Sequence, residues 1–190
     1  MEGSVIIPCH NGAQWVGAAV QSALEQTSVC VEVIVVDDGS TDGSVEVIKG
    51  FGDRVTLIRG DWKNGNGARN AGLAAARGKW IQFLDADDFL KPDKITKQLT
   101  AATPDTEMIY SPLIVREEKK GGEVLETLSV PTQGADLIEQ WLRWELCQTG
   151  AALWRAPETA PNPALFGHLR RQHAEREHAG GCERVGLSPC

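Results

Sequence analysis

The first hundred residues alternate between short apolar runs and stretches with helical periodicity. Residues 4–7 and 31–36 are apolar runs rich in β-branched side chains, so each predicts a strand buried on both faces of a parallel sheet. Between these runs, apolar residues recur every three or four positions over residues 15–24, which predicts a helix. Strand, helix, strand is the repeating unit of an open α/β sheet.

The same alternation continues along the chain. It predicts strands over 54–59 and 79–84, and helices over 42–49 and 68–77. Ser40 or Thr41 is the expected cap of the first of these helices, and Gly78 is expected to end the second. Further on, the pattern predicts strands over 107–115 and 124–130 and a helix over 134–146. We therefore predict an α/β fold with an open, mostly parallel sheet flanked by helices in three layers.

Polar residues follow three of the predicted strands. They occupy positions 8–11, 37–42 and 85–88, and the last of these segments holds three carboxylates within four residues. Because ligands of open α/β sheets bind beyond the carboxyl ends of the strands, these three segments should form one site. The segment 37–42 is also typical of an ordinary polar turn and helix cap, so alone it does not require a functional site.

The three carboxylates should repel one another unless a cation neutralises them. Hard oxygen ligands suit Mg²⁺ or Mn²⁺. Alternation along an extended chain would direct Asp85 and Asp87 to one side and Asp88 to the other. Asp87 is then the predicted metal ligand and Asp85 faces the rest of the substrate. We predict that Asp88 caps a following helix whose first turn contains Pro92 and Asp93.

Charge and hydropathy restrict the class of function. The net charge of −7 argues against general nucleic-acid binding, which normally uses a basic patch. No uninterrupted apolar run reaches the roughly 18 residues that a membrane span requires, and no basic-then-apolar leader opens the chain. We therefore expect no transmembrane segment and a cytoplasmic location, with any membrane association peripheral at the inner face.

Four ordered motifs carry a family resemblance. They are VIIPCHN (5–11), VVDDGSTD (35–42), GARNAG (67–72) and FLDADD (83–88). In order and spacing they resemble the successive motifs of glycosyltransferase family 2, which has the GT-A fold. No glycine-rich dinucleotide fingerprint or GxxxxGK[ST] phosphate loop competes with this interpretation. The resemblance implies a GT-A domain over residues 1–155, with a nucleotide-sugar-binding half (1–100) and a partial acceptor half (101–155).

The resemblance implies a nucleotide-diphosphate sugar donor, with uridine or thymidine as the nucleoside. Pro8 would contact the base through its backbone, and His10 would lie against the ring, although a solvent-exposed loop position is the alternative for His10. Asp38 would accept a hydrogen bond from the uracil N–H, and Asp85 would contact the ribose, with Ala86 in the same donor site.

The resemblance also assigns the metal and the diphosphate. Asp87 would bind Mn²⁺ or Mg²⁺. Arg69 has two alternatives, which are assistance to the diphosphate and a structural pairing with an acidic strand end. Transfer would proceed with inversion to a hydroxyl of a glycan, lipid or other acceptor, and it needs an acidic general base from the second half of the domain.

That base is missing from its expected place. Residues 148–155 resemble the family strand that precedes the base region, but residues 156–190 contain no Asp, no Lys and no Trp. We interpret residues 156–190 as an atypical tail, either disordered or produced by a frameshift or truncation. Within residues 165–178 of this tail, Glu175 and Glu177 are the carboxylates available as a replacement base, in a context unlike the family motif. The alternative function is therefore an inactive remnant that binds the nucleotide sugar without transferring it.

Overall fold

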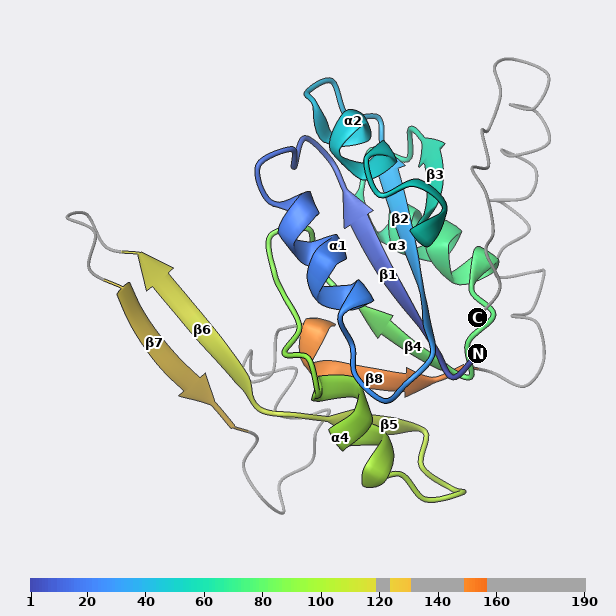
Figure 1. Cartoon of the computed structure of the whole chain (residues 1–190), viewed down its shortest axis with the longest axis vertical. Coiled ribbons are helices and arrows are strands. Elements are labelled where there is room, and N and C mark those ends of the chain that lie inside the picture. Colours follow the sequence, from blue (N-terminus) through green and yellow to red (C-terminus); the bar gives the residue numbers. More distant parts are fainter. Residues whose placement is uncertain (119–123, 131–148, 157–190) are drawn as a thin grey trace.

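Eight strands and four α-helices form from residues 1–118, 124–130 and 149–156, the parts of the chain that the computed structural model describes. The strands are β1 (Gly3–Cys9), β2 (Val31–Asp38), β3 (Thr56–Gly60), β4 (Trp80–Phe83), β5 (Met108–Tyr110), β6 (Leu113–Glu118), β7 (Val124–Ser129) and β8 (Ala152–Arg155). The α-helices are α1 (Val16–Leu24), α2 (Ser44–Lys49), α3 (Gly65–Ala75) and α4 (Lys94–Thr100). The main sheet has the order β3-β2-β1-β4-β8-β5, and β6 and β7 form a separate two-stranded sheet (Figure 1).

Four parallel strands from the first half of the chain, β3, β2, β1 and β4, lie next to one another on one side of the main sheet. β1 pairs with β2 on one side and with β4 on the other, and β3 extends the sheet beyond β2. Val5, Ile6 and Ile7 of β1 are completely buried, and the middle of β2 is almost as well shielded. Apolar, β-branched runs are typical of strands covered on both faces, so the predicted buried parallel sheet is confirmed.

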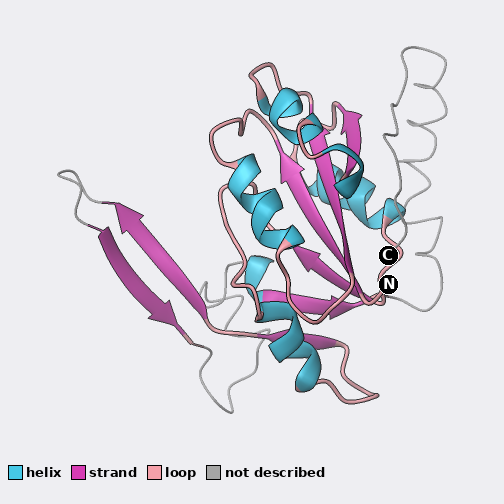
Figure 2. Ribbon diagram, in the orientation of Figure 1, coloured by secondary structure: helices cyan, strands magenta, loops and turns pink. Residues whose placement is uncertain are grey.

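Helices cover both faces of this sheet, which gives three layers (Figure 2). Because neighbouring side chains of a strand point to opposite faces, Val5 and Ile7 pack in the cluster that includes residues of α1, α2 and α4. Ile6 packs on the other face with Ala68 of α3. A Cβ at Gly72 would lie 2.3 Å from Cγ2 of Ile6, so α3 can approach the sheet this closely only with glycine there. The predicted three-layer α/β fold is confirmed.

The later strands join the sheet in the opposite direction. β8 pairs antiparallel with β4, and β5 pairs antiparallel with β8. Gln98 of α4 connects β5 to the turn that precedes β8, because its Nε2 donates to the carbonyls of Ile109 (2.9 Å) and Ala151 (3.0 Å). β6 and β7 form a ribbon that projects away from the main sheet (Figure 1), and its opposed residues Ile114 and Leu128 are both exposed.

Several predicted boundaries are wrong. The expected strand over 107–115 is two strands, β5 and β6, in different sheets. α2 follows Gly43, so neither Ser40 nor Thr41 caps it; instead the Asp42 carboxylate accepts a hydrogen bond from the Ser44 N–H at 3.0 Å.

Other predictions shift or lie beyond the described residues. α3 begins at Gly65 because the side chain of Asn64 accepts a hydrogen bond from Gly67 N–H at 2.8 Å, and it ends before Gly78. The predicted helix over 134–146 and residues 157–190 of the tail lie outside the described part of the chain. In that described part, none of the helices has the length and apolar character that a bilayer crossing requires.

Candidate functional site

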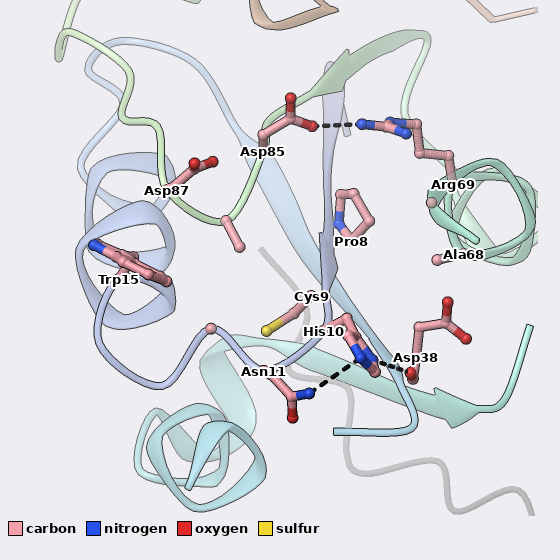
Figure 3. Close-up of a pocket in the computed structure, with 13 residues that line it drawn as sticks. Pro8, Cys9, His10, Asn11, Trp15, Asp38, Ala68, Arg69, Asp85 and Asp87 are labelled. Carbon is pink, nitrogen blue, oxygen red and sulfur yellow. Dashed lines mark hydrogen bonds and ion pairs between the residues drawn. The ribbon is translucent and has the colours of Figure 1, made fainter. Parts of the chain in front are cut away.

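A pocket of about 300 Å³ lies at the carboxyl ends of the parallel strands (Figure 3). It is lined by Pro8, Cys9, His10, Asn11, Gly12, Trp15, Asp38, Gly65, Ala68, Arg69, Asp85, Ala86 and Asp87. These residues come from the ends of β1, β2 and β4, the start of α3 and the loop before α1. All seven residues that the sequence assigned to the donor and the metal therefore line one pocket, although three long crossovers separate them in the chain.

Hydrogen bonds fix the ring of His10. Asn11 Oδ1 accepts a hydrogen bond from the Thr41 N–H at 2.8 Å, which orients the Asn11 amide so that its Nδ2 faces His10 Nε2 at 3.1 Å. The other ring nitrogen, Nδ1, lies 2.7 Å from the carbonyl oxygen of Asp38. Because a carbonyl only accepts and an amide nitrogen only donates, this geometry requires the neutral tautomer with the proton on Nδ1. His10 is exposed, and these two hydrogen bonds hold its neutral ring in one orientation where it lines the pocket.

The carboxylate of Asp38 organises the loop that leads into α3. Its Oδ1 accepts hydrogen bonds from the backbone N–H groups of Trp62 and Lys63, the latter at 3.0 Å. Its Oδ2 accepts one from the Asn64 N–H at 2.9 Å. Asp38 is buried and positions the residue that caps α3, so it has a structural role that the sequence motif did not reveal.

Arg69 forms an ion pair with Asp85. Its Nη2 lies 2.6 Å from Oδ1 of Asp85, and both side chains are partly buried (Figure 3). This contact ties the first turns of α3 to the end of β4. Of the two alternatives for Arg69, the structure shows the pairing with an acidic strand end. Arg69 also lines the pocket.

The acidic segment is a turn, not an extended chain. The N–H of Asp88 donates to the carbonyl of Asp85 at 3.0 Å. The predicted alternation is therefore wrong as a description of the backbone, even though Asp85 and Asp87 both line the pocket. The predicted cap is also wrong, because α4 follows Asp93 and begins at Lys94, well beyond Asp88.

Asp88 has an environment of its own. It is absent from the pocket lining, and its Oδ2 would lie 3.9 Å from a Cβ at Gly150, next to β8. Burial, together with the negative charges of Asp85 and Asp87, raises the pKa of the Asp88 carboxyl.

Asp87 is the carboxylate best placed to meet a cation. Within the described residues its side chain forms neither a hydrogen bond nor an ion pair, whereas Asp38 and Asp85 are both engaged. The same part of the chain contains no group of three or more His, Cys, Asp or Glu side chains arranged to hold a metal ion. Mg²⁺ is commonly held by one or two carboxylates, with substrate phosphates and waters completing its shell. The donor set fits a metal that is bound together with a diphosphate.

Sequence reasoning missed several lining residues. Asn11 adopts a left-handed conformation (φ 51°), which asparagine tolerates better than most residues, and it connects the first two loops. Trp15 stands at the start of an apolar helix, so its periodicity suggested a core position, but its side chain is 48% exposed. Gly65 and Ala68 line the pocket because α3 begins earlier than predicted.

Comparison with known protein families identifies one match. The model of the family described as "Glycosyl transferase family 2" matches residues 4–158. The matched segment includes β1 through β8 and therefore every element that contributes to the pocket.

Curated relatives carry related descriptions. The succinoglycan biosynthesis protein ExoO of Rhizobium meliloti is 43% identical over 99 residues, which are 51% of this chain and 28% of that protein. An uncharacterised glycosyltransferase of Nostoc is 36% identical over 84% of this chain and 49% of its own length. The Escherichia coli protein named UDP-Glc:alpha-D-GlcNAc-diphosphoundecaprenol beta-1,3-glucosyltransferase WfaP is 40% identical over 50% of this chain and 39% of that protein. The matched regions span less than half the length of these relatives.

Solved structures share the fold. The mannosyltransferase PcManGT of Pyrobaculum calidifontis, in complex with GDP-Man and Mn²⁺, superposes with a TM-score of 0.52 at 25% identity, over 56% of this chain and 34% of that chain. TarS 1–349 of S. aureus in complex with UDP gives a TM-score of 0.52 at 19% identity, over 90% of this chain and 49% of that chain. The second likeness concerns the fold alone. The α/β sheet with its pocket at the strand ends is thus the GT-A fold.

Proposed function

The chain belongs to glycosyl transferase family 2, and from this premise we propose that it transfers a sugar from a nucleotide-diphosphate donor to an acceptor hydroxyl. The donor is a UDP-sugar or a dTDP-sugar, the reaction inverts the anomeric centre, and it depends on Mn²⁺ or Mg²⁺. The observation that supports this proposal is the convergence of the strand-end segments on one pocket that contains Asp87, a carboxylate without a partner among the described residues. Residues 1–155 form the glycosyltransferase domain in this proposal.

The nucleoside end of the pocket contains Pro8, His10 and Asp38. His10 offers the face of a neutral ring whose orientation is already fixed, so stacking against a base costs little ordering. Asp38 Oδ2 accepts only one backbone N–H from the described residues, and a carboxylate oxygen can accept a second hydrogen bond. That free position receives the N3–H of uracil or thymine in our proposal.

The diphosphate end contains Asp85, Ala86 and Asp87. Asp87 holds the cation, and Arg69 keeps Asp85 oriented toward the ribose through their ion pair. A divalent cation would act as a Lewis acid that stabilises the negative charge growing on the departing diphosphate. Arg69 also lines the pocket, and its positive charge favours the same anionic product.

The acceptor hydroxyl must reach the anomeric carbon from the side opposite the diphosphate and lose its proton to a base. The pocket carboxylates Asp38, Asp85 and Asp87 all have roles on the donor side in this proposal. Glu175 and Glu177 lie outside the described residues, so the base stays unassigned. The acceptor is a hydroxyl of a glycan, a lipid or another molecule. Because the relative WfaP is named as a UDP-Glc-dependent glucosyltransferase, UDP-glucose is the first donor to test.

A donor-binding remnant without transferase activity is the second candidate. The family match covers residues 4–158 and ends close to the change in composition at residue 156. Translation of the encoding DNA in its other two frames past codon 155 tests the frameshift explanation. An acidic family-like motif in either frame would support it, and its absence from both would reject it.

Calorimetric titration tests the donor site directly. We expect the native chain to bind UDP in the presence of Mn²⁺ and to lose most of that affinity when Mn²⁺ is chelated. Asp87→Asn should abolish the Mn²⁺-dependent part of the affinity. Asp93→Asn is the matched control, because Asp93 is half-exposed and pairs with Lys97 outside the pocket at 2.6 Å. If native chain fails to bind UDP and dTDP with Mn²⁺ or Mg²⁺, both candidate functions are wrong.

A transfer assay then separates the two candidates. The assay supplies UDP-glucose or another UDP-hexose together with a panel of glycan and lipid acceptors, and it also measures hydrolysis of the donor. Turnover that disappears in Asp87→Asn supports the transferase. Tight, metal-dependent UDP binding with neither transfer nor hydrolysis supports the remnant.

A further inference from the structure

Trp15 is a large aromatic side chain that lies in the pocket wall without a role in the site described so far. Its backbone is fixed just before α1, since its N–H donates to the Gly12 carbonyl at 2.9 Å and its carbonyl accepts from Ala18 N–H at 2.9 Å. The side chain is 48% exposed, yet it lines the cavity. Among the described residues, the indole N–H has no hydrogen-bond acceptor.

The position of Trp15 relative to the other lining residues is informative. In Figure 3, Trp15 and Asp87 lie on one side of the pocket, whereas Asp38, Ala68 and Arg69 lie on the other side. His10 lies between them, close to Asp38. The pocket therefore has a nucleoside side, at Asp38, and a far side, at Asp87 and Trp15.

The covalent order of the donor maps onto this arrangement. In a nucleotide-diphosphate sugar, the diphosphate separates the nucleoside from the sugar. With the base at Asp38 and the diphosphate at Asp87, as in the proposed function on which this inference rests, the sugar must extend beyond Asp87. Trp15 is the aromatic residue of the pocket lining on that side, because the other ring, His10, belongs to the nucleoside side.

We propose that Trp15 binds the transferred sugar and contributes to the choice of donor. The C–H groups on one face of a pyranose carry partial positive charge, and the face of an indole ring carries partial negative charge, so the two attract each other while both leave water. The indole N–H can in addition donate to a sugar hydroxyl. Sugars whose hydroxyls interrupt the apolar face would stack less well, which makes the contact selective among epimers.

Comparison of UDP with UDP-hexoses tests this role in the full chain. Titrations with UDP, UDP-glucose, UDP-galactose and UDP-N-acetylglucosamine, each with Mn²⁺ and without acceptor, give Kd values for native chain, Trp15→Ala and Trp15→Phe. We expect Trp15→Ala to raise Kd for the preferred UDP-hexose about tenfold, which corresponds to ~1.4 kcal/mol, and to change Kd for UDP less than about twofold. Trp15→Phe should restore most of the affinity, because the ring face remains.

Phe89→Ala is the matched control, since Phe89 is 64% exposed and lies outside the pocket lining. It should leave the Kd values for UDP and for the UDP-hexoses unchanged. Circular dichroism and thermal unfolding verify that each variant folds, which we expect for side chains as exposed as these.

Three outcomes would overturn the inference. Equal losses of UDP and UDP-hexose affinity in Trp15→Ala would place Trp15 at the nucleotide. Unchanged donor affinities, with an increased KM for the acceptor, would place it at the acceptor. Binding of UDP by native chain without binding of any UDP-hexose would leave no sugar for Trp15 to contact. Absence of UDP binding to native chain is a different result, because it contradicts the proposed function itself and the inference with it.

Discussion

The parallel half of the sheet and the later strands are built on different principles. β1 to β4 are connected by local crossovers, lie side by side and bury apolar side chains on both faces. β8 inserts between β4 and β5, and β6 and β7 form an exposed ribbon. All the candidate donor residues belong to the parallel half. A parallel arrangement brings strand ends to one edge automatically, whereas antiparallel strands distribute their ends over both edges.

Stability should differ between the two regions in the same way. An isolated two-stranded ribbon is at best marginally stable in water, and within the described residues β6 and β7 pair only with each other. β1, β2 and β4 lie in a sheet covered by helices on both faces, and each of these strands has two neighbouring strands. The three predictions below use matched changes in the two regions and at their junction.

The largest expected effect is the difference in stability loss when isoleucine is replaced by alanine in each of the two regions. Ile6 in β1 is 0% exposed and Ile114 in β6 is 42% exposed. Ile6→Ala should lower the free energy of unfolding by roughly 3–4 kcal/mol, because it removes buried methyl groups and leaves a cavity. Ile114→Ala should change it by less than about 0.5 kcal/mol. Urea unfolding monitored by circular dichroism gives both values.

If Ile6→Ala does not fold, Ile6→Val keeps the comparison measurable, with an expected loss of about 1 kcal/mol. Equal losses at Ile6 and Ile114 would contradict the contrast between a buried sheet and an exposed ribbon.

The second prediction concerns Asp38, where the fold and the site meet. Asp38→Ala leaves the backbone N–H groups of Trp62, Lys63 and Asn64 without their acceptor. We expect a loss of about 2 kcal/mol in the free energy of unfolding, together with weaker UDP binding. Asp53→Ala, which removes an exposed carboxylate from the same half, should change neither quantity. If Asp38→Ala weakens UDP binding without lowering the free energy of unfolding, Asp38 does not stabilise the loop before α3 and acts only through contact with the ligand.

The smallest effect is expected at Lys94, at the junction of the two regions. Its Nζ donates to Oε1 of Gln82, whose Nε2 donates to the Gly150 carbonyl at 2.9 Å. Burial lowers the pKa of Lys94 from 10.5 to about 7. Between pH 7 and pH 10.5, Lys94 is protonated in the unfolded chain and deprotonated in the folded chain. The free energy of unfolding therefore rises with pH over this range.

Lys94→Met removes this titration. From pH 6 to pH 9, the free energy of unfolding of the native chain should therefore rise by at least about 1 kcal/mol more than that of Lys94→Met. Urea unfolding at both pH values measures this difference. Lys97→Met is the control, since Lys97 is 75% exposed on the same helix. A pH dependence that stays the same in Lys94→Met would show that other groups produce it.

Particular residues show how far sequence reasoning reached. Pro8, His10, Asp38, Asp85 and Asp87 were placed correctly at one edge, because each follows a strand whose apolar run is easy to recognise. Asp88 was misassigned as a helix cap because α4 begins only at Lys94, so Pro92 and Asp93 precede the helix and do not form its first turn. β5 and β6 were merged although Ser111 and Pro112 interrupt the apolar run at the point where the chain changes sheet.

The sequence by itself determined the parallel sheet, the location of its functional edge and the residue types at that edge. Side-chain periodicity and the rule for strand ends are local properties, so a single chain displays them. Only the tertiary structure decided that Arg69 pairs with Asp85, that Asn11 and Asp38 fix the His10 ring, and that β8 separates β4 from β5. It also decided that Trp15 faces the pocket and not the core. These contacts join residues that are distant in the chain, and they depend on how helices and loops pack, which no local pattern specifies.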